Sequence, residues 1–153
     1  MQLLDSRFAD RQVREYAVKC LEDFSDADLT TYLLQLVQVL KYEPYHDSAL
    51  ARFLVRRALR SRRVGHAFFW YLKAEMHVLE IAERYGLLLE AYLHGCGSHL
   101  NQLENQNLLL TDLTTVANMI KTIPVSERKQ IMLNELRKLK LPDKFQLPLS
   151  PRY

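Results

Sequence analysis

Three side chains that could bind a metal ion, His94, Cys96 and His99, lie within six residues of one another. A closed zinc site needs four ligands, which are commonly grouped in two pairs. No second pair follows this cluster, and Cys20 would have to reach it from another helix. We therefore predict that these residues have structural roles and that the chain binds no metal.

Two dipeptides, Asp10-Arg11 and Asp23-Phe24, occur in the order of the catalytic loop and the magnesium-binding loop of phosphoryl-transfer enzymes. A catalytic loop of this kind needs a histidine and an asparagine where the chain has Gln12 and Glu15, and Ser25 replaces the glycine of the second loop. The nine residues before Asp10 are too few for a lobe that holds nucleotide phosphates. We therefore predict no catalytic residue.

The other residues of catalytic or ligand-binding type are isolated. Gly95-Cys96-Gly97 is a lone Gly-x-Gly with no strand before it and no lysine after it, so it predicts the end of a helix and not a phosphate-binding loop. His46, His66 and His77 have no serine, cysteine or carboxylate at a spacing that defines a catalytic triad. His66 precedes an aromatic run and is expected to pack in or near the core. We predict no cofactor site.

Residues 51–63 contain six arginines and no acidic residue, whereas the rest of the chain has 15 basic and 18 acidic residues and a net charge of −3. At helical spacing Arg52, Arg56 and Arg60 share one edge, and Arg63 extends it. Guanidinium groups bind carboxylates and phosphates. The edge is therefore a solvated face paired with nearby acids, a contact with an acidic protein surface, or a site for lipid or nucleic acid. Because the remainder is net negative and no groove of interleaved basic and aromatic residues is evident, we predict no nucleic-acid partner and keep these four arginines as a candidate protein interface.

The elements that position these residues are expected to be helices. The chain has 153 residues, of which 48% are apolar and 25% charged, enough for one soluble domain with a core. Four glycines and five prolines are few for the tight turns of an all-β fold. No apolar run approaches the roughly 18–20 residues that span a bilayer, and the first residues lack the pattern of a signal peptide. Cys20 and Cys96 are interpreted as buried thiols in a reducing compartment, so we expect a cytoplasmic protein.

The apolar spacing predicts an all-α fold of about seven helices. One helix covers about residues 26–40 and begins at a capping box of Ser25 and Asp28. Asp47 is the predicted N-cap of the next helix, and a strongly periodic helix spans about 78–94. Gly86 within it costs about 1 kcal/mol relative to alanine and indicates close approach by a neighbouring helix. The others are expected around 64–72, 109–120 and 126–139, and at the front around Val13, Tyr16, Ala17 and Cys20.

Helices with apolar residues on more than one side stack well in a solenoid, so we predict antiparallel helix pairs in a right-handed, armadillo-like α-α superhelix. The sequence has no crisp repeat that would identify one directly. Residues 1–141 form the predicted helical domain. Residues 142–153, with prolines at 142, 148 and 151, form a predicted linker.

Residues 34–77 resemble a known family. The segments QLVQVLKYE, SALARFLVRRAL and RVGHAFFWYL follow one another as in the helical accessory (PIK) domain of phosphoinositide 3-kinases. The matching positions are Leu36, Val37, Gln38, Leu40, Lys41, Tyr42, Glu43, Ser48, Leu50, Phe53, Leu54, Arg57, Ala58, Leu59, Arg63, Gly65, His66, Phe69, Trp70 and Leu72. The resemblance is strong over residues 2–97 and weaker over 98–140. Within the family, Gly65-His66 together with Glu75-Met76-His77 is similar to class I enzymes.

The resemblance implies a spine that carries the kinase, lipid-binding and Ras-binding domains of a larger enzyme, with a regulatory subunit as a further candidate partner. That enzyme would phosphorylate the 3-hydroxyl of phosphatidylinositol lipids with ATP and magnesium, and neither would bind to this chain. It would be cytoplasmic and reach the plasma membrane only as part of the parent enzyme. The family's domain begins with earlier helices, so we expect an apolar face to be open around Val13 and Val18.

The alternative function is a stand-alone helical adaptor that binds a protein partner through the same surface. A folded, monomeric isolated chain with one specific partner would favour the adaptor, whereas aggregation would favour a fragment of a lipid kinase. A self-sufficient enzyme is disfavoured because no acid–base pair, nucleophile or phosphate cradle is found in the sequence.

Overall fold

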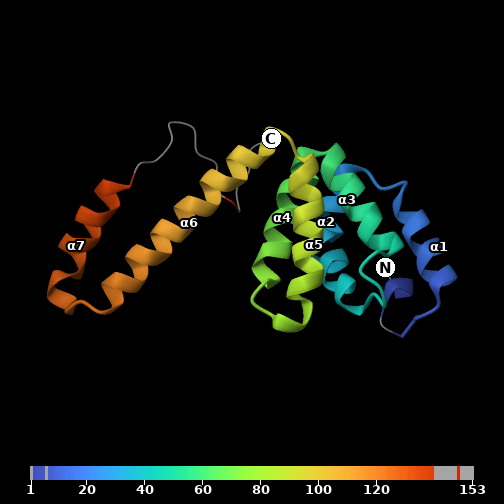
Figure 1. The fold of residues 1–153 in the computed structure, drawn as a ribbon, viewed down its shortest axis with the longest axis horizontal. Coiled ribbons are helices and arrows are strands. Elements are labelled where there is room, and N and C mark those ends of the chain that lie inside the picture. Colours follow the sequence, from blue (N-terminus) through green and yellow to red (C-terminus); the bar gives the residue numbers. More distant parts are fainter. Residues whose placement is uncertain (1, 6, 140–147, 149–153) are drawn as a thin grey trace. The chain divides into compact units, whose positions relative to one another are not determined.

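The computed structural model describes residues 2–5, 7–139 and 148, and in this part of the chain every regular element is helical (Figure 1). The all-α prediction with about seven helices is therefore confirmed. The predicted linker, 142–153, lies outside the described residues except for Pro148. The elements are η1 (Gln2–Leu4), α1 (Arg11–Leu21), α2 (Asp26–Val39), η2 (Leu40–Tyr42), α3 (Ala49–Arg60), α4 (Arg62–Glu75), α5 (Leu79–Gly95), α6 (His99–Lys121) and α7 (Val125–Lys138).

The chain divides into two compact units, one ending at Gly97 and the other starting at Ser98. The boundary follows the predicted helix end, since α5 stops at Gly95 and Gly97 has a φ of 56°. Left-handed backbone of this kind is accessible to glycine without the steric cost that a Cβ brings. The domain limits at 141 and 142 and the handedness of the superhelix stay predictions.

The first unit is built around α4, which packs against α2, α3 and α5, while α1 packs on α3 (Figure 1). Most of the apolar residues that recur at three- and four-residue intervals in α2–α5 are buried, as the spacing predicted, although Tyr32 of α2 is 43% exposed. The largest fully buried side chains are Tyr85, Tyr92, Phe53, Phe68, Leu4, Leu29, Leu33, Leu36, Leu40, Leu50, Leu54 and Leu72. These side chains form the core of the first unit, and the core holds its helices in place relative to one another.

Two helix starts illustrate how local polar chemistry sets the boundaries. The Ser25 side chain accepts from the backbone N–H of Asp28, as predicted, but the Asp28 carboxylate takes the Ser25 hydroxyl at 2.6 Å instead of a backbone N–H. Aspartate is one carbon shorter than the glutamate of a capping box, which accounts for the change. The predicted cap at Asp47 is wrong. Ser48 caps α3 by accepting from Ala51 at 3.2 Å, and Asp47 pairs with Arg52.

The inward face of α1 differs from the expected one. Tyr16 is 63% exposed and Cys20 is exposed, whereas the buried residues are Arg14, Ala17, Val18 and Leu21. The interpretation of the cysteines as buried is therefore wrong for Cys20, and Cys96 is half-buried. The open apolar face expected around Val13 and Val18 is wrong at Val18, which is only 6% exposed, and Val13 is half-buried.

The close helix approach expected at Gly86 is found at Gly65 instead. A β-carbon at Gly86 would meet nothing nearer than Met76 Cε at 3.7 Å, an ordinary contact. At Gly65 it would lie 2.2 Å from Tyr92 Oη and 2.6 Å from the carbonyl oxygen of Ala58. Gly65 thus allows α3, α4 and α5 to pack closely where α4 begins.

The second unit consists of α6 and α7, which pack on each other as a helical hairpin (Figure 1). All residues of α7 are described, and none of them is buried. Its larger apolar side chains include Val125, Met132, Leu133 and Leu136, which are 37–77% exposed. This hairpin therefore has far less core of its own than the first unit.

Candidate docking site

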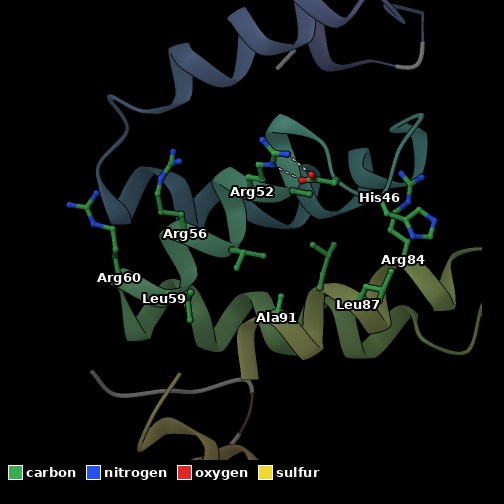
Figure 2. Close-up of a pocket in the computed structure, with 12 residues that line it drawn as sticks. His46, Arg52, Arg56, Leu59, Arg60, Arg84, Leu87 and Ala91 are labelled. Atoms are coloured by element: carbon green, nitrogen blue, oxygen red, sulfur yellow. Dashed lines mark hydrogen bonds and ion pairs between the residues drawn. The ribbon is translucent and has the colours of Figure 1, made fainter. Parts of the chain in front are cut away.

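The predicted arginine edge lies on the outer face of α3 and at the start of α4. Arg52, Arg56 and Arg60 are exposed and form a row along α3 (Figure 2). Arg63 is exposed in the first turn of α4. Spacing of four residues on a helix places side chains above one another, which explains the row. The shared edge inferred from the sequence is therefore present.

Two of these arginines have acidic partners in the part of the chain that the structure describes. Arg52 pairs with Asp47, and Arg56 pairs with Glu22. The hydrogen bonds from Arg52 hold the pKa of the Asp47 carboxyl below its usual range. Both pairs are exposed on both sides, by 43–70%, and ion pairs of this kind contribute only about 0–1 kcal/mol. The guanidinium groups can therefore exchange or share these partners at little cost.

Arg57 has a different role from its neighbours. It is 7% exposed and donates to the Phe24 carbonyl at 2.7 Å and to Asp26 Oδ1 at 2.9 Å. These contacts tie α3 to the start of α2, and the hydrogen bond from Arg57 lowers the pKa of Asp26. The guanidinium carbon also lies 5.7 Å from the centre of the Phe53 ring. The burial of Arg57 could have been predicted from the sequence, since position 57 follows Phe53 and Leu54 at the spacing of the buried face.

A groove next to the arginine row was not predicted from the sequence. It lies between α3 and α5, has a volume of about 590 Å³, and is open to solvent (Figure 2). Its floor is apolar and consists of Ala51, Val55, Leu59, Leu87, Leu88 and Ala91. Leu59 and Leu87 are 42% and 46% exposed although they are large hydrophobic side chains. The groove arises where two apolar faces meet, so only the pairing of α3 with α5 reveals it.

Charged groups surround this apolar floor. Arg52, Arg56 and Arg60 line its α3 side, and Arg84 and His46 lie at one end (Figure 2). Arg84 donates to the Leu40 carbonyl, which fixes the position of its side chain. Asp47 is the acidic side chain in the lining. Four guanidinium groups line the groove, and Asp47 and Glu22 pair with two of them, so the rim keeps a net positive charge.

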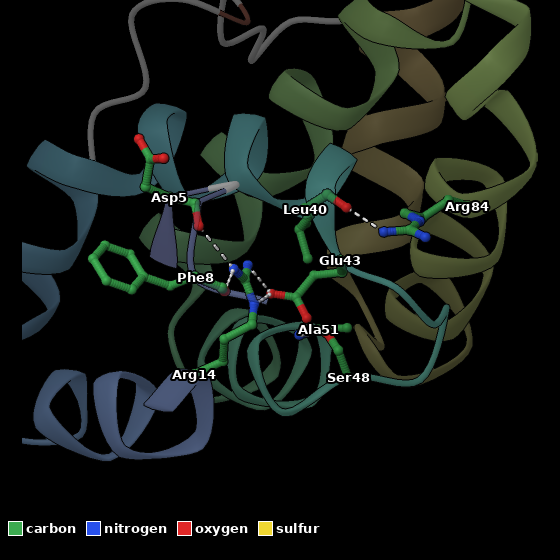
Figure 3. Close-up of polar contacts among 8 residues, drawn as sticks. All are labelled: Asp5, Phe8, Arg14, Leu40, Glu43, Ser48, Ala51 and Arg84. Atoms are coloured by element: carbon green, nitrogen blue, oxygen red, sulfur yellow. Dashed lines mark hydrogen bonds and ion pairs between the residues drawn. The ribbon is translucent and has the colours of Figure 1, made fainter. Parts of the chain in front are cut away.

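A second polar cluster lies near the N-terminal segment, where Arg14 and Glu43 form a buried ion pair (Figure 3). Arg14 Nη2 is 2.6 Å from Glu43 Oε1, and the two side chains are 6% and 5% exposed. Arg14 also donates to the carbonyls of Asp5 and Phe8, at 3.2 and 2.9 Å. Glu43 was noted only as part of the family pattern and Arg14 not at all. Their contacts join the N-terminal segment, α1 and the loop after η2, which is a structural role.

The residues that mimic catalytic loops have structural contacts. Asp10 caps α1 by accepting from the Val13 N–H at 3.0 Å, and Arg11 pairs with Glu15 at 2.7 Å. Ser25 caps α2, as described above. Asp10, Arg11 and Ser25 therefore have structural contacts, and the Phe24 carbonyl accepts a hydrogen bond from Arg57.

The histidines are found in separate environments. His66 is 1% exposed and its ring centre lies 6.4 Å from that of Trp70, which confirms the predicted packed imidazole. His94 Nε2 lies 3.7 Å from Glu90 Oε1, one turn earlier in α5. His99 is buried. Among the described residues no three His, Cys, Asp or Glu side chains are grouped as a metal site would require.

None of the helices in the described part of the chain is both long enough and apolar enough to cross a bilayer.

Comparison with known proteins identifies the family of this chain. The model of the phosphoinositide 3-kinase family accessory domain (PIK domain) matches residues 1–105, which include α1–α5. Phosphatidylinositol 3-kinase 2 of Dictyostelium discoideum is 55% identical over 155 residues, covering 100% of this chain and 8% of that protein. Phosphatidylinositol 3-kinase 1 of the same organism is 50% identical over 153 residues, covering 100% of this chain and 10% of that protein. The chain therefore spans about a tenth of the length of these relatives, and it belongs to the accessory-domain (PIK domain) family of the phosphoinositide 3-kinases.

Proposed function

We propose that the chain is the structural and docking domain of a phosphatidylinositol 3-kinase. The family match and the two relatives support this proposal, since both relatives are named as phosphatidylinositol 3-kinases and each is about ten times longer than the chain. The parent enzyme would phosphorylate the 3-hydroxyl of phosphoinositides. ATP and magnesium would bind to its kinase domain, and the enzyme would act in the cytoplasm with recruitment to the plasma membrane.

The observation that carries the docking role is the exposed basic edge on a rigid helical unit. Arg52, Arg56, Arg60 and Arg63 project from α3 and α4, which are held in place by the shared core. A row of guanidinium groups binds carboxylates with defined geometry. We infer that this edge contacts an acidic face of a neighbouring domain of the same enzyme, such as the kinase, lipid-binding or Ras-binding domain.

The test replaces Arg56, Arg60 and Arg63 with glutamate in the whole kinase that carries this chain. Each change reverses one exposed charge and buries nothing, so folding should be retained, while contact with an acidic domain turns into repulsion. We expect weaker association of separately expressed domains and lower lipid-kinase activity. Lys73→Glu, which reverses an exposed charge elsewhere on α4, is the control.

Unchanged domain association and unchanged activity in the triple variant would contradict the docking role of the edge. A specific partner from outside the kinase, bound by the isolated chain and lost in the same variant, would instead support the adaptor function.

A further inference from the structure

The groove between α3 and α5 combines an apolar floor with a basic rim, and this combination defines the chemistry of an occupant. We propose that it binds an acidic amphipathic helix from another part of the same polypeptide. The inference rests on the docking function proposed above and specifies the kind of segment that would bind beside the basic edge.

The apolar part of the occupant follows from the floor. Leu59 and Leu87 face the open groove from opposite helices and keep nearly half of their surface in contact with solvent (Figure 2). Water contact with large aliphatic side chains is unfavourable, and a leucine or phenylalanine of a partner would remove it. The small residues Ala51 and Ala91 leave the space that such a side chain needs.

The acidic part follows from the rim. Among the described residues, Arg52 and Arg56 form exposed ion pairs with Asp47 and Glu22, and a guanidinium group has five donors. Carboxylates of a partner can therefore bind without first breaking a buried pair. Arg60 and Arg84 extend the positive charge toward the two ends of the groove (Figure 2).

The helical form follows from the spacing of the cations. Arg52, Arg56 and Arg60 are four residues apart, which is about 6 Å per step along α3. Acidic residues at the same four-residue spacing on a helix laid along the groove would meet all three. Apolar residues three and four positions apart would then point to the floor, the pattern of a helix-in-groove contact.

The size of the groove indicates an intramolecular occupant. A groove of about 590 Å³ takes only a few side chains of a partner. A contact made by so few side chains is smaller than a stable interface between separate proteins, which buries roughly 1,200–2,000 Å² and involves about 20–30 residues on each side. A weak site is filled when its ligand is tethered, because the effective concentration then reaches about the millimolar range. The relatives have some nine-tenths of their length outside the region that matches this chain.

The first arm of the test uses the 153-residue chain and a synthetic helical peptide. Leucines at positions i, i+3 and i+7 form one face of the peptide, and glutamates flank them. We expect saturable binding by fluorescence anisotropy, at least tenfold weaker with Ala91→Trp, which fills the groove, and with the Arg56→Glu and Arg60→Glu pair. The control Ala27→Glu changes an exposed alanine on α2 and should bind as the parent chain does. Absence of binding, or equal binding of a peptide with lysines in place of the glutamates, would overturn the proposal.

The second arm identifies the source of the helix. In the longer kinase polypeptide the tethered segment should occupy the groove, so the same peptide should bind at least tenfold more weakly than to the 153-residue chain. Equal affinity would show that the groove is free in the longer protein and would overturn the intramolecular occupant. If the arginine variants disrupt domain association but Ala91→Trp does not, docking through the basic edge stands and the groove is excluded.

Discussion

The two units of the chain differ in what their apolar residues contact, although the same spacing predicted the helices of both. In α3, six of twelve residues are buried, whereas α7 has none buried among its fourteen. The apolar residues of α7 also recur at helical intervals, but within the described part of the chain none of them is buried. Periodicity therefore predicts that a helix forms, but the neighbours decide whether its apolar face is buried.

Among substitutions that test this comparison, we expect the largest loss of stability at the buried ion pair of Arg14 and Glu43 in the first unit. Glu43→Ala leaves the Arg14 guanidinium 6% exposed and without its carboxylate. Loss of one partner of a buried pair costs about 3–5 kcal/mol. Urea unfolding followed by the fluorescence of Trp70, the chain's one tryptophan, measures the change in this unit.

The matched control is Glu135→Ala in α7, which removes the carboxylate partner of Lys138. Lys138 is 68% exposed, so we expect a change below about 0.5 kcal/mol. The double variant Arg14→Met with Glu43→Leu should recover most of the loss, because no buried charge is then left unpaired. A small effect of Glu43→Ala alone would mean that water reaches the pair.

A second comparison uses one substitution at two leucines. Leu54 in α3 is fully buried, and Leu136 in α7 is 37% exposed. Removing a buried leucine side chain costs about 2–5 kcal/mol through lost burial and the cavity left behind. We expect this loss for Leu54→Ala and less than about 1 kcal/mol for Leu136→Ala, by urea unfolding followed by circular dichroism and Trp70 fluorescence. Similar losses at the two positions would remove the distinction between the units.

The third prediction concerns two glycines with opposite surroundings inside the first unit. Gly65→Ala places a β-carbon 2.6 Å from the Ala58 carbonyl oxygen, and such overpacking costs about 1–3 kcal/mol. Gly86→Ala meets only Met76 Cε at 3.7 Å and should stabilise α5 by up to about 1 kcal/mol. Thermal unfolding of the two variants should therefore shift in opposite directions. A loss of stability in both would mean that Gly86 is also at a close contact.

The glycines also illustrate how far the sequence predicts the fold. Helix positions, the cap at Ser25 and the end at Gly95 depend on residues close in sequence and were predicted. The close approach at Gly65 depends on Tyr92, 27 positions away, and local patterns carry no such information. The close approach was predicted at Gly86 from the propensity cost of glycine in a helix, and that cost is the same at Gly65.

The same distinction holds for the candidate site. The arginine row was predicted because it lies on one helix, whereas the groove needs α3 and α5 side by side. Arg57 is part of the same run of arginines, but its pairing with Asp26 removes it from the surface. Charge composition thus identified the segment, and tertiary packing divided it into structural and exposed groups.

The smallest predicted effect is a pH dependence that belongs to the first unit. Glu75 at the end of α4 accepts hydrogen bonds from Lys41 Nζ at 2.9 Å and from Gln38 Nε2 at 2.8 Å, and these hold its pKa below the ordinary 4.5. Near pH 4 the unfolded chain therefore binds more protons at this position than the folded chain. The stability that Glu75 contributes is present above about pH 4.5 and is lost as the pH falls.

Glu75→Gln should lower the unfolding free energy by less than about 1 kcal/mol at pH 7, because Glu75 is partly exposed. The difference between the two proteins should shrink as the pH falls through the lowered pKa of Glu75 and disappear once Glu75 is protonated in the folded chain as well. Asp26 and Asp47 titrate in both proteins and cancel in the difference, so a gap that persists at low pH would assign the effect to lost packing and not to the charge.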